Sequence, residues 1–173
     1  MGKIKHHFFI ALFIACLAAA VQLTDQLLYT YMPVQGSGYG WIAFLAWAVY
    51  FFNGCTVKGG IRSAIAFFLG MIGGIVIFTV SGWLSGLGFF ATPLALALTV
   101  PFMIYLEIPP EWTNSVPAFF VGCGTFFGCM MYISGATYRT VLITEGIYLL
   151  IGLLAGWITI MFRGWYSTRF PVK

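Results

Sequence analysis

The sequence predicts an all-α membrane protein with six transmembrane helices and both termini on the inner side of the membrane. Composition is the first observation, because 61% of the 173 residues are hydrophobic and only 7% are charged, whereas about 25% of the residues in a soluble domain are charged. Length is the second, because a helix that crosses a bilayer needs about 20 apolar residues, and the chain has room for about six. We therefore expect a single integral membrane domain over residues 1–173.

Six apolar segments follow one another with short breaks between them. The expected spans are residues 8–31, 40–53, 61–80, 87–106, 116–133 and 140–162. The second is short and aromatic. The fourth contains Pro93 and Pro101, each of which removes a backbone hydrogen bond and favours a kink.

The distribution of basic residues supports this number of spans. With the N-terminus inside, the outer segments carry only Arg139, and the inner segments carry all the other basic residues: Lys3, Lys5, Lys58, Arg62, Arg163, Arg169 and Lys173. Such a bias sets the orientation of membrane proteins. The loop before the fifth span holds Glu107 and Glu111 without a basic residue, but acidic residues contribute little to the rule.

The two halves of the chain, residues 8–80 and 87–162, show a weak internal similarity. Ala43-Phe44 matches Ala118-Phe119, and Phe51-Phe52 matches Phe126-Phe127 at the same offset. Three spans in each half would make the halves an inverted repeat, an arrangement that recurs in transporters with the solute site near the repeat interface. The alternative is a chance match between helices rich in Phe, Gly and Ala.

Glycine pairs at four-residue spacing predict close helix packing. These pairs are Gly70/Gly74, Gly124/Gly128 and Gly152/Gly156. The fifth span contains Gly122, Gly124 and Gly128, more than packing requires, with Thr125 between them. It either lines a narrow path or packs at the centre of the bundle.

The first span carries a carboxylate, Asp25, at a depth where charge is costly. Gln22, Asp25, Gln26 and Tyr29 follow the spacing of one helix face. We expect this face to look into the protein rather than at lipid.

The sixth span carries a second acid, Glu145, at a similar depth, with Tyr148 one turn later. We expect the two acids to meet in a vestibule open to the outer side, which would suit a cation, an amine or urea-like donor, or a proton. A structural alternative is a salt bridge from either acid to Arg139. Asn53, at the inner end of the second span, either caps that helix or lines an inner gate.

Several segments resemble the YcdZ-like family, small bacterial inner-membrane proteins with a domain of unknown function. They are "FFNGCTVKGG" at residues 51–60, "VPAFFVGCGTFFG" at 116–128 and "GLLAGWITIMFRGW" at 152–165. The resemblance covers residues 40–165 and implies a multi-helix fold in the bacterial inner membrane. It implies no activity.

No catalytic triad, metal-ligand spacing or phosphate-binding loop is found in the sequence, so we expect neither an enzyme nor a cofactor. The basic residues lie at helix ends and do not form a nucleic-acid-binding surface. We expect a channel or facilitator for a small polar or cationic solute, assembled as a homo-oligomer in the lipid bilayer. The alternative is a non-transport membrane partner, such as an assembly or scaffold subunit.

Overall fold

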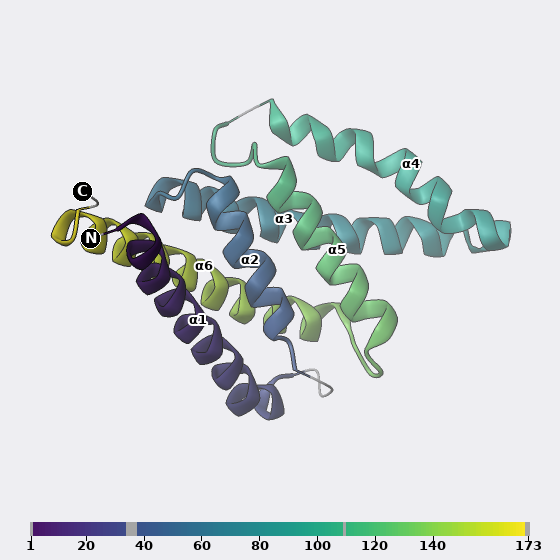
Figure 1. Cartoon of the computed structure of the whole chain (residues 1–173). Helices are drawn as coiled ribbons and strands as arrows, with labels where there is room; N and C mark the ends of the chain where they lie inside the picture. The colour runs from purple at the N-terminus through teal and green to yellow at the C-terminus, as the bar shows by residue number, and fades with distance from the viewer. Residues whose placement is uncertain (1, 34–37, 109, 172–173) are drawn as a thin grey trace.

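The part of the chain that the structure describes contains six α-helices (Figure 1). The computed structural model describes residues 2–33, 38–108 and 110–171, and these contain no β-strand. The helices are α1 (Lys3–Leu28), α2 (Gly40–Phe52), α3 (Val57–Trp83), α4 (Ala91–Ile104), α5 (Val116–Tyr132) and α6 (Tyr138–Arg169). Three 3-10 turns adjoin them: η1 (Tyr29–Tyr31), η2 (Ser85–Phe90) and η3 (Tyr105–Glu107).

These helices agree with the expected spans in number and order. Four segments are long and apolar enough to cross a membrane, namely Lys3–Tyr31, Val57–Trp83, Ser85–Ile104 and Tyr138–Arg169. This property indicates a membrane protein. The remaining two, α2 and α5, are shorter, and α2 with its 13 residues extends only about 20 Å at helical rise.

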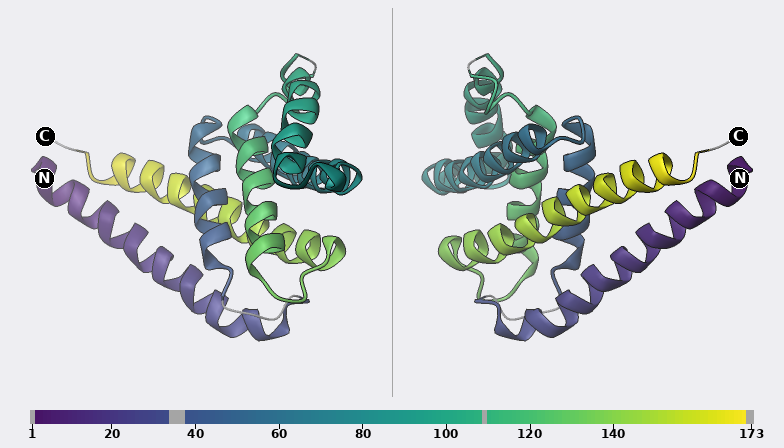
Figure 2. Two further views of the ribbon diagram at one scale, coloured as in Figure 1. Left: turned by 90° about the vertical axis from the view of Figure 1, so that its right-hand side faces the viewer. Right: turned by 90° about the vertical axis from the view of Figure 1, so that its left-hand side faces the viewer.

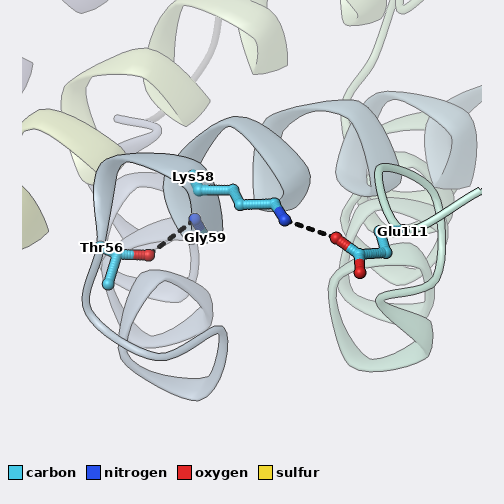
Figure 3. Close-up of polar contacts among 4 residues, drawn as sticks. All are labelled: Thr56, Lys58, Gly59 and Glu111. Carbon is cyan, nitrogen blue, oxygen red and sulfur yellow. Dashed lines mark hydrogen bonds and ion pairs between the residues drawn. The ribbon is translucent and has the colours of Figure 1, made fainter.

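Residues that favour helix starts or breaks lie at the beginning of α3 and around and within α4. α3 begins after Thr56, whose hydroxyl accepts a hydrogen bond from the backbone N–H of Gly59 at 3.0 Å (Figure 3). Pro93 lies in the first turn of α4, where a proline is tolerated, and Pro101 lies inside that helix. The break before α4 falls at Gly88, which has a φ of 53°.

α3 and α5 form one of the two most extensive helix pairs, and glycine allows their close approach. A methyl group placed on Gly70 would lie 2.0 Å from the carbonyl oxygen of Phe119. One turn further, a methyl group on Gly74 would lie 2.7 Å from the ring of Phe126. The packing role predicted for this glycine pair is confirmed.

α2 and α6 form the other extensive pair, with the same spacing of contacts. A methyl group on Gly152 would lie 2.1 Å from the carbonyl oxygen of Ala43, and one on Gly156 would lie 2.8 Å from the ring of Tyr50. The packing role predicted for this pair is also confirmed. In both helix pairs the glycines are four residues apart and their contact residues are seven apart.

The packing prediction was wrong for the third glycine pair. A methyl group on Gly124 would meet nothing within 4 Å, and one on Gly128 would make only an ordinary contact with Trp41 at 3.6 Å. The glycines of α5 that face solvent or lipid therefore leave room beside the helix without being required for packing.

The N-terminal part of α1 and the C-terminal part of α6 lie together, so both termini are at one end of the molecule (Figure 2). The Phe13 and Phe162 rings stack with centroids 3.7 Å apart, and His6 packs against Tyr166 at 5.1 Å. Elsewhere, Lys58 at the start of α3 forms an ion pair with Glu111 in the α4–α5 loop (Figure 3). Lys173, counted with the inner residues above, lies outside the described residues.

Candidate functional site

Asp25 is buried, with 3% of its surface exposed, and its carboxylate joins three helices. Its Oδ1 accepts hydrogen bonds from the backbone N–H of Tyr39 at 2.8 Å and from the hydroxyl of Tyr148 at 2.7 Å. Its Oδ2 accepts a bond from the side-chain amide of Gln22 at 3.2 Å. Both oxygens are therefore satisfied by protein groups.

The position of Tyr39 explains why this carboxylate is tolerated. Tyr39 is the residue directly before α2, so Asp25 places a negative charge at the positive end of that helix and accepts from one of its first N–H groups. Glycine makes the approach feasible, because a methyl group on Gly38 would lie 2.2 Å from Oδ2 of Asp25. Asp25 is thus the anchor that holds the start of α2 against α1 and α6.

Glu145 is completely buried, with 0% of its surface exposed, between α6 and α5. The hydroxyl of Thr125 lies 2.9 Å from Oε2 of Glu145 and 3.0 Å from the carbonyl oxygen of Gly122. A hydroxyl has a single proton and serves one acceptor at a time. When Thr125 donates to Gly122, its bond to Glu145 requires a proton on the carboxyl group.

The other oxygen of Glu145 has no well-formed hydrogen bond. Oε1 is buried and unpartnered, and the buried hydroxyl of neighbouring Thr144 is also unpartnered. The thiol of Cys129 lies beside this carboxyl group, but a thiol is a weak donor. Glu145 therefore has unused hydrogen-bonding capacity, unlike Asp25.

The structure places the other predicted residues of the first span mostly at the surface. Gln22 and Gln26 are exposed and Tyr29 is half-buried. The expectation that the whole face looks into the protein was wrong for both glutamines, because the face is buried at Asp25 and only partly buried at Tyr29. Gln22 reaches the site through its amide group.

Arg139 does not pair with either acid. It is exposed, and among the described residues the ion pairs include none between Arg139 and Asp25 or Glu145. Neither acid is therefore balanced by the salt bridge that the sequence offered as the structural alternative.

Asn53 ends α2, as expected, and contacts α3. Its side-chain amide donates to the hydroxyl of Ser63 at 2.7 Å and to the carbonyl oxygen of Val49 at 3.3 Å. Ser63 in turn donates to the carbonyl oxygen of Gly59 at 2.8 Å. Asn53 thus closes the last turn of its own helix and fastens it to α3.

The two acids belong to separate hydrogen-bond networks, and no shared vestibule joins them in the contacts described above. Hollows of about 390 Å³ between α3 and α4 and about 520 Å³ between α3 and α6 have apolar linings that include neither acid. No group of three His, Cys, Asp or Glu side chains in the described part of the chain is placed to hold a metal ion. The site consists of Glu145 and its hydroxyl and thiol neighbours.

The model of one protein family matches residues 11–162, which is most of the chain. Its description is "Protein of unknown function (DUF1097)". The chain belongs to the DUF1097 family. The match includes Asp25, Glu145 and the helices that bury them.

No curated protein and no solved structure matches this DUF1097 chain. The expectation of a domain of unknown function is confirmed, while the YcdZ-like name and the bacterial origin stay predictions. The site of this DUF1097 protein must therefore be interpreted from its own geometry.

Sequence reasoning missed three partners of the candidate residues: Tyr39 beside Asp25, Cys129 beside Glu145 and Ser63 beside Asn53. Tyr39 contributes a backbone N–H, and a backbone group cannot be predicted from the type of its residue. Cys129 lies three residues before the end of α5, and a lone thiol gave no metal spacing. Ser63 was detectable in principle, since it is a polar residue ten positions from Asn53 in an otherwise apolar segment.

Proposed function

We propose that this protein crosses the membrane six times and lets a small polar or cationic solute pass, with Glu145 lining the path. The observation that carries the proposal is the unpartnered oxygen of a completely buried carboxyl group. An acidic side chain at membrane depth costs at least about 2.5 kcal/mol, and a buried oxygen without a partner adds to that cost. A solute that donates a hydrogen bond to Oε1 would recover part of it.

Asp25 takes a different role in this proposal from the one the sequence suggested. Its oxygens already accept bonds from Gln22, Tyr39 and Tyr148, so nothing remains for a solute to satisfy. Asp25 and Tyr148 shape the wall of the bundle, and Glu145 with Thr125 offers the binding groups.

The inverted repeat of three helices per half is part of the proposal. When the first half (α1–α3) is matched to the second (α4–α6), α2 corresponds to α5 and α3 to α6, so the extensive pair α3–α5 corresponds to the extensive pair α6–α2. In both pairs two glycines pack against contact residues at the same spacing. By these contacts Ala43 of the first half corresponds to Phe119 of the second. The sequence match instead aligns Ala43 with Ala118, one residue earlier. The paired helices α2 and α5 then have opposite directions, as an inverted repeat requires.

Six crossings are supported by the ends of the helices. The two termini lie together, and the ion pair of Lys58 with Glu111 joins two segments that the basic residues assign to the inner side. The short α2 and α5 each contact α3 and α6, and they lie side by side in the middle of the molecule (Figure 1).

The test is solute flux into liposomes that contain the purified protein. The panel comprises water, urea, methylammonium, potassium and acetate, measured by stopped-flow light scattering or by internal indicators. We expect one class of solute to pass above empty liposomes and Glu145→Gln to change its rate. Gly146→Ala is the matched control, because a methyl group on Gly146 meets nothing within 4 Å.

A non-transport membrane partner is the second candidate, and one observation favours it. The hollow between α3 and α6 is apolar and open, and large apolar side chains of α1 such as Phe8 and Leu12 are exposed, so the protein offers faces to other helices. Absence of flux for every solute of the panel would support this candidate over the facilitator, and association into a homo-oligomer is compatible with both.

A further inference from the structure

We propose that Asn53 and Ser63 form a second polar binding site, called the inner station, at the inner end of the same path. The solute of this path is a small neutral molecule with hydrogen-bond donors and acceptors, of the urea or simple amide class. This inference rests on the proposed function. It names the solute class and adds a binding site at the inner end of α2 and α3.

The two halves of the chain place a polar pair at equivalent positions. Asn53 and Cys129 each lie ten residues beyond the first glycine-contact residue of their helix, and Ser63 and Glu145 each lie seven residues before the first glycine of theirs. The contact between Asn53 and Ser63 therefore corresponds to the contact between Cys129 and Glu145. The inversion puts one polar pair at each end of the bundle.

The chemistry of the inner pair suits a solute that forms hydrogen bonds. Asn53 has an amide with both donors and an acceptor, and its side chain is only half-buried, so it is reachable from the inner side. Ser63 is fully buried and hydrogen-bonded to Asn53 and Gly59. Both N–H groups of this amide are engaged by Val49 and Ser63, so its oxygen is the atom that a solute can reach. A solute that meets this oxygen and, further on, the carboxyl group of Glu145 must be able to donate hydrogen bonds.

The charges at the two ends of the path favour a neutral solute. The inner pair is neutral, and the described acid at this end, Glu111, is already paired with Lys58. The ends of the helices assigned to the inner side carry an excess of basic residues, namely Lys3, Lys5, Lys58, Arg62, Arg163 and Arg169. The resulting positive potential disfavours a cation at the inner mouth, and the carboxyl group of Glu145 disfavours an anion. A neutral solute meets neither obstacle.

The experiment compares urea and acetamide with methylammonium in proteoliposomes of the full-length protein. Urea and acetamide are expected to pass, and methylammonium is expected to stay at the level of empty liposomes. Asn53→Ala should lower the urea rate about tenfold, the factor for about 1.4 kcal/mol. Thr168→Ala is the control at the same end, because its exposed hydroxyl bonds only the carbonyl oxygen of Gly164.

A variant that adds charge keeps the test decisive if Asn53→Ala fails to fold. Asn53→Asp puts a carboxylate at the inner station and should allow methylammonium to pass. Elution of the variant as a single species in size-exclusion chromatography confirms that it is folded. Passage of methylammonium but not urea through the wild-type protein would overturn the inference. So would a urea rate that depends on Glu145 and not on Asn53, and in both cases the facilitator itself would stand. No flux of any solute would remove the facilitator and the inference together.

Discussion

The replacement of Asp25 by alanine tests the anchoring role of its carboxylate. In the wild-type protein Oδ1 of Asp25 accepts two buried hydrogen bonds, from Tyr39 and from Tyr148. Alanine removes the acceptor and leaves both donors enclosed by the same neighbours. Gln22 is exposed and can turn its amide to another partner, so its loss adds little.

The expected loss of stability follows from these two donors. A buried donor left without an acceptor costs about 1–3 kcal/mol, so Asp25→Ala should destabilise the fold by about 2–6 kcal/mol. That is a large part of the roughly 5–15 kcal/mol that stabilises a typical protein. Asp25→Asn retains an acceptor oxygen at the Oδ1 position and should cost much less.

The assay is reversible unfolding in mixed micelles, followed by circular dichroism as a denaturing detergent is added. Thr24→Ala is the control on the same helix, because the Thr24 hydroxyl bonds only the carbonyl oxygen of Ala20 within α1. A free energy of unfolding for Asp25→Ala within about 0.5 kcal/mol of the control, the usual range for surface substitutions, would refute the anchoring role.

Three further predictions concern other contacts. Gly152→Ala should destabilise the protein by about 1–3 kcal/mol through overpacking against α2. Gly124→Ala should be neutral or stabilising by about 0.5–1 kcal/mol, because a methyl group on Gly124 meets nothing within 4 Å. Equal free energies of unfolding for the two variants would contradict the packing described. The hydrogen bond and charge of the Lys58 ammonium hold the pKa of the Glu111 carboxyl group below its usual range. The ion pair therefore stabilises the fold at pH values above the ordinary glutamate pKa, and this stabilisation is lost as pH falls through the lowered pKa. In an NMR titration Lys58→Ala should raise the Glu111 pKa, and an unchanged pKa would exclude the pair in solution. A cysteine at Arg139 should react with a membrane-impermeant maleimide from the outer side and one at Lys58 only from the inner side, and labelling of both from one side would contradict the six crossings.

The helices were predictable because the physical signals for them are local. Apolar runs of sufficient length and the positions of basic residues predicted six segments whose ends lie within seven residues of the helices observed. The glycine pairs of α3 and α6 were predictable for the same reason, since four-residue spacing places both glycines on one face. The similar pair in α5 shows the limit of that rule, because spacing does not say whether a neighbour covers the face.

The site was only partly predictable because its partners come from distant segments. The sequence identified Asp25, Glu145 and Tyr148, but it paired the two acids with each other. In the structure Asp25 bonds a backbone N–H exposed by the start of α2 and Glu145 bonds Thr125. Which helix faces which acid depends on how the helices cross, and the crossing is set by the glycine contacts rather than by the polar residues.

The most direct test of the central claim compares the two acids in one flux measurement. Urea permeability of proteoliposomes is measured for the wild-type protein, Glu145→Gln and Asp25→Asn at equal amounts of folded protein. We expect Glu145→Gln to change the permeability and Asp25→Asn to leave it near the wild-type value, because of these two acids only Glu145 has an oxygen without a well-formed hydrogen bond in the described part of the chain. A rate that depends on Asp25 and not on Glu145 would contradict the account.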